Sequence, residues 1–190
     1  MKKILLALIC LTVVLTYADA ETDIQNWLCP DPIGFRGIRW GQELSGITTL
    51  KSIGSLDFSK YEDVFDKIGE HPAFYFLKEW SGNGYVNEKD NPKIGYADVK
   101  EIIYLFQEER FYGVVIESLG STNRNELEKA VNAWIGNPTV KLNIGNDYVV
   151  VWERCRIRVV LDFTRTVLAS KRDIKLYIIS KDMEAHFIGF

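Results

Sequence analysis

The sequence has few of the residues on which metal and nucleophile chemistry depends. Its 190 residues include two histidines and three cysteines, and neither His71 nor His186 has a histidine or cysteine at the spacing of a metal site. No phosphate-binding loop and no G-x-S-x-G motif occurs. We therefore expect no metal and no cofactor, and we assign no catalytic residue.

Long apolar runs are also missing, since a membrane-spanning helix needs about 20 such residues. The run at Ile4–Val14 is too short for that role, and it follows Lys2 and Lys3. Ala18 and Ala20 place small residues at positions −3 and −1 of a cleavage site. This layout is typical of a secretory signal peptide. We expect residues 1–20 to be removed, the chain to be periplasmic or secreted, and no transmembrane span to remain.

The rest of the composition is that of an ordinary globular domain. Apolar residues make up 47% of the chain and charged residues 26%, with only five prolines. These values exclude disordered and collagen-like chains. The 13% of aromatic residues favours a packed core with strands. We expect residues 21–190 to form one domain.

Export would leave two of the three cysteines, Cys29 and Cys155, in an oxidising compartment. An even pair there is a disulfide candidate, and the alternative is two small buried thiols. Within the predicted strand 155–163, strict alternation places Cys155 on the core face.

Strand-like segments outnumber helical ones and cluster along the chain. We predict strands at 73–80, 99–106, 111–119, 148–152, 155–163 and 175–180, a short strand or turn at 35–40, and a turn or mobile loop at 81–92 around Asn83 and Gly84. The segments 99–106 and 111–119 should form an antiparallel hairpin. A capping pattern at Asn123 and Glu126 predicts a helix over 124–135, and a weaker pattern allows one over 59–69.

Because the strands do not alternate regularly with helices, the pattern predicts an α+β fold. We expect an antiparallel sheet of about five to seven strands, with the helix at 124–135 packed on one face.

Three motifs resemble those of an uncharacterised family of exported bacterial proteins. They are FRGIRWG at 35–41, KIGYADVKEIIYLFQEERFYGVVIES at 93–118, and IGNPT at 135–139. Members of the family carry an F-x-G-I-x-W-G opening, an R-F-Y-G-V hairpin and a G-x-P-T helix end. The resemblance covers most of residues 35–180. It implies a small exported α+β domain, and it supplies no activity and no catalytic residue.

The charge pattern singles out one segment. Residues 154–181 carry a net charge of +6, whereas the predicted mature chain carries −4. In a strand, Arg154, Arg156 and Arg158 would share one face and repel one another unless negative charge lies over them. Carboxylates of neighbouring strands could supply that charge. Otherwise the three arginines form a binding surface for an anionic ligand.

These observations favour an exported cell-envelope binding or interaction module. Its partner could be an anionic envelope component or an acidic protein, and we expect no nucleic acid. Two alternatives remain open. One is a small secreted hydrolase that uses paired carboxylates, although Glu108 and Glu109 are more simply explained as a solvated turn. The other is a structural subunit that pairs through a sheet edge.

Overall fold

The computed structural model describes residues 32–57, 81–144, 147–163 and 173–183. The predicted signal peptide, the predicted helix at 59–69 and the predicted strand at 73–80 lie outside these ranges, as do Cys29 and both histidines. The chain divides into the units 1–31 and 32–190, and only the second contains described residues.

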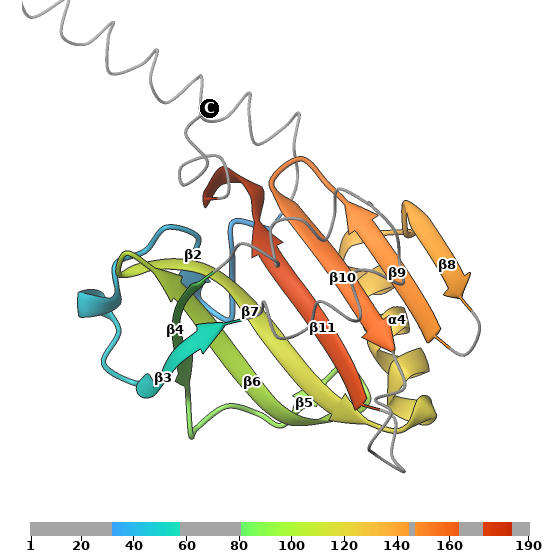
Figure 1. The fold of residues 1–190 in the computed structure, drawn as a ribbon, viewed down its shortest axis with the longest axis horizontal. Helices are drawn as coiled ribbons and strands as arrows, with labels where there is room; N and C mark the ends of the chain where they lie inside the picture. The colour runs from blue at the N-terminus through green and yellow to red at the C-terminus, as the bar shows by residue number, and fades with distance from the viewer. Residues whose placement is uncertain (1–31, 58–80, 145–146, 164–172, 184–190) are drawn as a thin grey trace, which may run out of the picture. The chain divides into compact units, whose positions relative to one another are not determined.

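One antiparallel sheet of nine strands dominates the described residues (Figure 1). Eight strands follow the order β3-β4-β6-β7-β11-β10-β9-β8, and β5 pairs with β6 beside this path. The α+β prediction is therefore confirmed, whereas the predicted number of strands is too low. The bounds are β3 Lys51–Asp57, β4 Ser81–Val86, β5 Lys93–Ile94, β6 Ala97–Gln107, β7 Arg110–Leu119, β8 Val140–Ile144, β9 Asp147–Glu153, β10 Ile157–Phe163 and β11 Asp173–Ser180.

The predicted hairpin is confirmed as β6 and β7, the two longest strands. Gln107 pairs with Arg110, so Glu108 and Glu109 alone form the turn. Both have positive φ, 49° and 64°. A two-residue turn with positive φ at both positions matches the twist of the flanking strands. It also places the two glutamates in a backbone region that favours asparagine and glycine.

The prediction of a turn or loop over 81–92 is wrong for its first half, which is strand β4. Gly84 pairs with Gly54 of β3 and with Leu105 of β6. A Cβ at Gly84 would lie 2.5 Å from Leu56 Cδ1. This glycine therefore allows close packing beside β3 and does not mark a chain reversal. The turn residues occur later, where the Asp90 amide donates to the Asn87 carbonyl.

The FRGIRWG motif forms a small hairpin of β1, Gly34–Phe35, and β2, Ile38–Arg39. Phe35 and Ile38 are buried against the core of the sheet. The Trp40 ring stacks on Phe111 with centroids 5.0 Å apart, and its indole N–H donates to the Pro32 carbonyl at 2.8 Å. The prediction of a short strand or turn at 35–40 is confirmed.

The predicted helix is confirmed as α4, Ser121–Ile135, which begins three residues before the predicted start. Asn123 is not its cap. Its side chain accepts from the Asp98 amide at 3.2 Å and donates to the Asp98 carbonyl at 3.0 Å, so it binds the first turn of α4 to β6. Leu127 and Val131 are buried, whereas Trp134 is 41% exposed. The helix ends at Gly136, whose φ is 85°.

Both faces of the sheet are apolar. The side chains on the first face, among them Phe106, Ile116 and Leu161, form one buried cluster with Leu127 and Val131 of α4. Those on the second face form a separate buried cluster. Strand β10 is buried along its whole length, including its two charged residues, Arg158 and Asp162. Helix α4 covers part of the first face (Figure 1).

The β6–β7 turn generates a prediction about stability. Replacing Glu108 by Asn and Glu109 by Gly should raise the free energy of unfolding by about 1 kcal/mol, because both new residues tolerate positive φ. Urea denaturation measures the change. The Glu108→Gln/Glu109→Gln variant removes the same charges and keeps the strained backbone, so it should show no such gain. Equal stabilisation of the two variants would show that charge and not backbone conformation is responsible.

Candidate functional site

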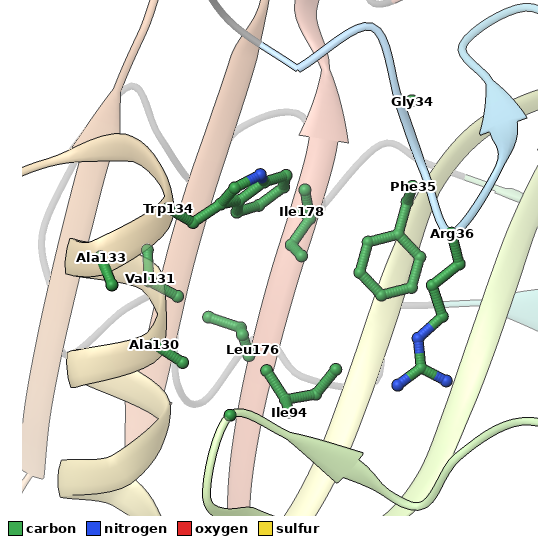
Figure 2. A pocket seen from close by; sticks show the side chains of 11 residues that line it. Gly34, Phe35, Arg36, Ile94, Ala130, Val131, Ala133, Trp134, Leu176 and Ile178 are labelled. Atoms are coloured by element: carbon green, nitrogen blue, oxygen red, sulfur yellow. The ribbon is translucent and has the colours of Figure 1, made fainter.

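A concave apolar site lies on the first face of the sheet, between α4 and the β1–β2 hairpin (Figure 2). We call it the α4 cleft. Its volume is about 440 Å³, which is within the range of small-molecule sites. Four parts of the chain that are distant in sequence line it, with these residues: Gly34, Phe35 and Arg36; Ile94 and Gly95; Ala130, Val131, Ala133 and Trp134; Leu176 and Ile178.

Small residues occupy much of the wall of the α4 cleft. Ala130 lies on the side of α4 that faces the cleft, opposite Gly95, and Ala133 is exposed at the edge of the cleft (Figure 2). A Cβ at Gly95 would come within 3.0 Å of the Ala130 Cβ, and the φ of Gly95 is +59°. A Cβ at Gly34 would lie 2.1 Å from the Ile38 carbonyl oxygen. Gly34 therefore cannot carry a side chain without moving the backbone, and at Gly95 a side chain would be strained by the positive φ.

Among the large apolar side chains that line the α4 cleft, Trp134 is exposed, whereas Phe35, Val131, Leu176 and Ile178 are buried. Trp134 projects from α4 into the cleft (Figure 2) and is 41% exposed. Ile33 and Tyr96, each next to a lining glycine in sequence, are 52% and 87% exposed. An exposed aromatic side chain at a concave site is typical of binding sites.

The charged group in the lining is Arg36, and the loop before β5 holds it. Its guanidinium donates to the carbonyls of Asn91 and Lys93 at 3.0 and 2.9 Å, and it lies 3.4 Å from an Asp90 carboxylate oxygen. Asp90 also accepts a 2.6 Å hydrogen bond from the hydroxyl of buried Tyr104. Burial, followed by the Asp90 carboxylate, raises the pKa of Tyr104, so this hydroxyl remains a donor at neutral pH.

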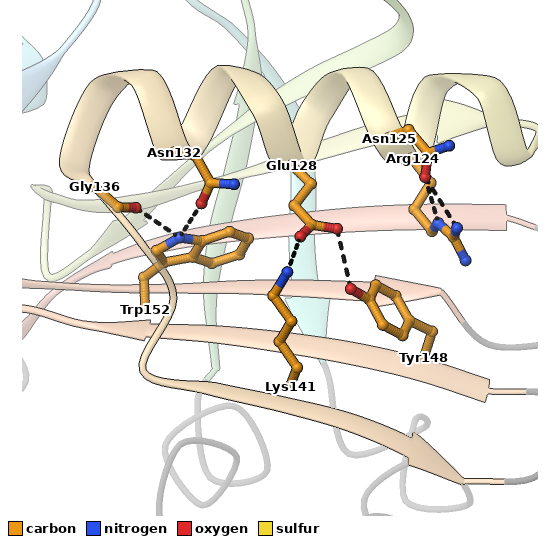
Figure 3. A network of polar contacts seen from close by, with 8 residues as sticks. All are labelled: Arg124, Asn125, Glu128, Asn132, Gly136, Lys141, Tyr148 and Trp152. Carbon is orange, nitrogen blue, oxygen red and sulfur yellow. Dashed lines mark hydrogen bonds and ion pairs between the residues drawn. The ribbon is translucent and has the colours of Figure 1, made fainter.

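The opposite side of α4 is bound to strands β8 and β9 by a polar network (Figure 3). Glu128 accepts hydrogen bonds from Lys141 at 2.5 Å and from the Tyr148 hydroxyl at 3.1 Å. Burial, followed by the Glu128 carboxylate, raises the pKa of Tyr148, so Tyr148 is a donor and not a nucleophile. The Arg124 guanidinium lies 4.7 Å from the centre of the Tyr148 ring. The network positions the helix and offers no reactive group.

The three arginines singled out by sequence do not share a strand face. Strand β10 begins at Ile157, so Arg154 and Arg156 lie in the turn after β9 and only Arg158 lies in the strand. The sequence R-C-R-I-R alternates like a strand, but the Arg154 amide donates to the Ile157 carbonyl and closes a turn.

Contacts within the chain engage these arginines. The Arg154 guanidinium donates to the carbonyls of Ile135, Glu153 and Asn137, at 2.8, 2.9 and 2.6 Å, and so binds the C-terminal end of α4. Arg158 is 9% exposed and forms an ion pair with Glu153. For Arg158, a neighbouring strand therefore supplies the carboxylate. Arg156 is partly exposed, and anion binding by this group of residues stays a prediction.

Cys155 lies in the same turn and is exposed. Its predicted place on the core face is therefore wrong, because the turn interrupts the alternation. The disulfide with Cys29 stays a prediction, since Cys29 lies outside the described residues. The chain-entropy model gives such a bridge about 4–5 kcal/mol of stabilisation.

A smaller pocket of about 230 Å³ lies beside β6 and contains the carboxylates of Glu88, Asp90 and Glu101. Glu88 forms an ion pair with Lys51 at 3.1 Å, and Asp90 forms one with Arg36. In residues 32–57, 81–144, 147–163 and 173–183, no three His, Cys, Asp or Glu side chains are grouped as a metal site requires. The hydrolase alternative stays a prediction.

Comparisons with protein-family models, curated proteins and solved structures return no match to this chain. The resemblance to a family of exported proteins therefore stays a prediction. Within the described part of the chain, no helix has both the length and the apolar character needed to cross a membrane.

The contacts of Arg154 lead to a second prediction about stability. Replacing Arg154 by Ala should lower the free energy of unfolding by about 2–3 kcal/mol, because charge-assisted hydrogen bonds to the end of α4 are lost. The free energy of unfolding of Arg154→Lys should fall between those of the wild type and Arg154→Ala, since one ammonium cannot reach three carbonyls. Thermal or urea denaturation measures the effect.

Arg39→Ala is the matched control, because Arg39 is an exposed arginine in β2. It should change the free energy of unfolding by no more than about 0.5 kcal/mol. If Arg154→Ala is as stable as Arg39→Ala, the contacts of Arg154 do not hold α4 in place.

Proposed function

We propose that this chain is an exported binding module of the cell envelope and that its ligand site is the α4 cleft. The signal-peptide pattern of residues 1–20 supports export. The observation that carries the binding proposal is an open apolar cleft of about 440 Å³ into which a 41%-exposed tryptophan projects.

Physical reasoning connects that observation to binding. Protein interiors are normally packed to a density that leaves few voids larger than a water molecule. When a ligand fills an apolar cleft, each Å² of apolar surface that it buries stabilises the complex by about 25 cal/mol. Alanine at positions 130 and 133 leaves space that larger side chains would fill.

The other predicted functions have less support in the geometry. Arg154 and Arg158 are engaged in contacts within the chain, which weakens the anion-binding prediction. Two of the three carboxylates in the smaller pocket are in ion pairs, whereas a glycosidase acid usually needs apolar surroundings that raise its pKa.

Sheet-edge pairing also has less support than the α4 cleft. The strands at the two ends of the described sheet path are β3 and β8. Strand β3 contains an irregularity between Ser52 and Gly54, and β8 has only five residues. Bulges and short edge strands are features that discourage pairing with another chain.

The binding proposal is tested by blocking the α4 cleft. In the full chain, Ala133→Leu should extend a larger side chain over the cleft from its edge, and leucine keeps a strong helix former in α4. We expect this variant to weaken binding of the fluorescent probe N-phenyl-1-naphthylamine at least about tenfold, because the new side chain competes for the space. The enhancement of probe fluorescence on titration measures the dissociation constant.

Thr122→Leu is the matched control. Thr122 is exposed in the first turn of α4 and does not line the α4 cleft. It adds the same leucine to the helix surface, and it should leave probe binding unchanged. Equal probe affinity for wild type and Ala133→Leu, or no probe binding by wild type, would contradict the proposed function.

A further inference from the structure

The β1–β2 hairpin forms one wall of the α4 cleft, and it needs support from the rest of the chain. Within the described residues, it is a two-stranded sheet of its own with two residue pairs, and a hairpin of this size is not stable alone. Its base is tied to the main sheet, because Trp40 stacks on Phe111 and the Gly41 amide donates to the Phe111 carbonyl at 2.8 Å. The turn of Arg36 and Gly37 lies at the opposite end of the hairpin.

The Arg36 side chain ties this turn to a second part of the cleft wall. It points toward β5 (Figure 2), and its guanidinium donates to the carbonyls of Asn91 and Lys93 at 3.0 and 2.9 Å. Lys93 begins β5, and the next two residues, Ile94 and Gly95, line the α4 cleft. The separation of the hairpin and β5 therefore depends on how the guanidinium is held.

The Asp90 carboxylate is placed to hold that guanidinium. One of its oxygens lies 3.4 Å from Arg36, and the other accepts the 2.6 Å hydrogen bond from the Tyr104 hydroxyl. Tyr104 is 1% exposed and belongs to β6, a strand inside the sheet, so it is a rigid support. A chain of contacts thus runs from the core through Tyr104 and Asp90 to the hairpin turn.

Partial burial distinguishes the Arg36–Asp90 pair from a neighbouring ion pair of equal length. The side chains of Arg36 and Asp90 are 23% and 16% exposed. Those of Lys93 and Asp98, also 3.4 Å apart, are 56% and 75% exposed. An exposed pair contributes little, whereas one that is partly shielded from water interacts more strongly.

We propose that Asp90 is a positioning residue of the α4 cleft, an inference that rests on the proposed function. Asp90 does not line the cleft, and its carboxylate belongs to the smaller pocket beside β6. Held by Tyr104, this carboxylate orients the Arg36 guanidinium toward the two carbonyls at β5. Arg36 in turn keeps the β1–β2 hairpin at the separation from β5 that gives the cleft its width. The affinity of the α4 cleft is therefore set in part from a second pocket.

Hydrogen exchange tests the effect on the hairpin without a ligand. In the full chain, Asp90→Asn removes the charge and keeps an oxygen that can accept from Tyr104. The amides of Phe35 and Ile38 should exchange about fivefold faster in this variant, because the hairpin is released more often. The amide of Val160 in β10 should exchange at the same rate as in the wild type.

Probe binding tests the effect on the α4 cleft. Asp90→Asn should weaken the binding of N-phenyl-1-naphthylamine about fivefold, because the hairpin wall is no longer held in place. Asp98→Asn is the matched control, since it removes the exposed partner of Lys93 in β5. It should leave probe affinity and hairpin exchange unchanged.

A double-mutant cycle tests whether Asp90 acts through Arg36. Arg36→Gln alone should also weaken probe binding. In that background Asp90→Asn should have no further effect, because the guanidinium that it orients is absent. If the two effects add, Asp90 does not act through Arg36 and the positioning role is contradicted.

Failure of this inference differs from failure of the proposed function. If the wild type binds the probe and Asp90→Asn binds it as tightly as Asp98→Asn does, the α4 cleft is a binding site and Asp90 does not position it. If the wild type binds no probe, the proposed function fails. Hairpin exchange then decides the rest, because an unchanged rate in Asp90→Asn would show that Asp90 does not hold the hairpin.

Discussion

The position of helix α4 on the sheet is the constraint on which the rest of the structure depends. Polar contacts hold the helix along its length: Asn123 binds the backbone of β6, Glu128 binds side chains of β8 and β9, and Arg154 binds the carbonyls after its last turn. Near the same end, the Trp152 indole N–H donates to Asn132 at 3.0 Å and to the Gly136 carbonyl at 3.1 Å (Figure 3). Apolar packing alone would allow the helix to slide, whereas these contacts fix its register.

A helix fixed in this way can leave one side uncovered. Leu127 and Val131 are buried against the sheet, while Ala130 and Trp134 face the β1–β2 hairpin across the α4 cleft. The hairpin is itself held by the stacking of Trp40 on Phe111 and by the contacts of Arg36. Both walls of the cleft are therefore anchored by contacts made outside it. Because the walls are already ordered, ligand binding does not carry the entropic cost of ordering them.

Local signals in the sequence predicted the parts of the fold that local forces determine. The β6–β7 hairpin and α4 follow from apolar periodicity and from the end of the helix at Gly136. Asn83 and Gly84 are common in turns, so the sequence predicts a turn where β4 lies. Glycine occupies position 84 because a Cβ there would collide with Leu56. The R-C-R-I-R alternation suggested a longer strand, but backbone hydrogen bonds place Arg154 in a turn.

The candidate site could not be found in this way, because its lining comes from four segments that are distant in sequence. Helical spacing identifies Trp134 as a residue of the apolar side of α4, but spacing alone cannot show that it projects into an open cleft. Ala130, four residues before Trp134, was a weak signal, because a small residue on a core-facing side leaves space.

The central claim is that a small apolar ligand binds in the cleft between α4 and the β1–β2 hairpin. Methyl-resolved NMR of the full chain with and without N-phenyl-1-naphthylamine tests it most directly. The account predicts ring-current shifts at the methyl groups of Ala133, Leu176 and Ile178, with the methyl groups of Leu105 and Val160 on the second face of the sheet unchanged. Shifts centred on Leu105 and Val160, or no shift at Ala133 and Ile178 at saturating ligand, would contradict it.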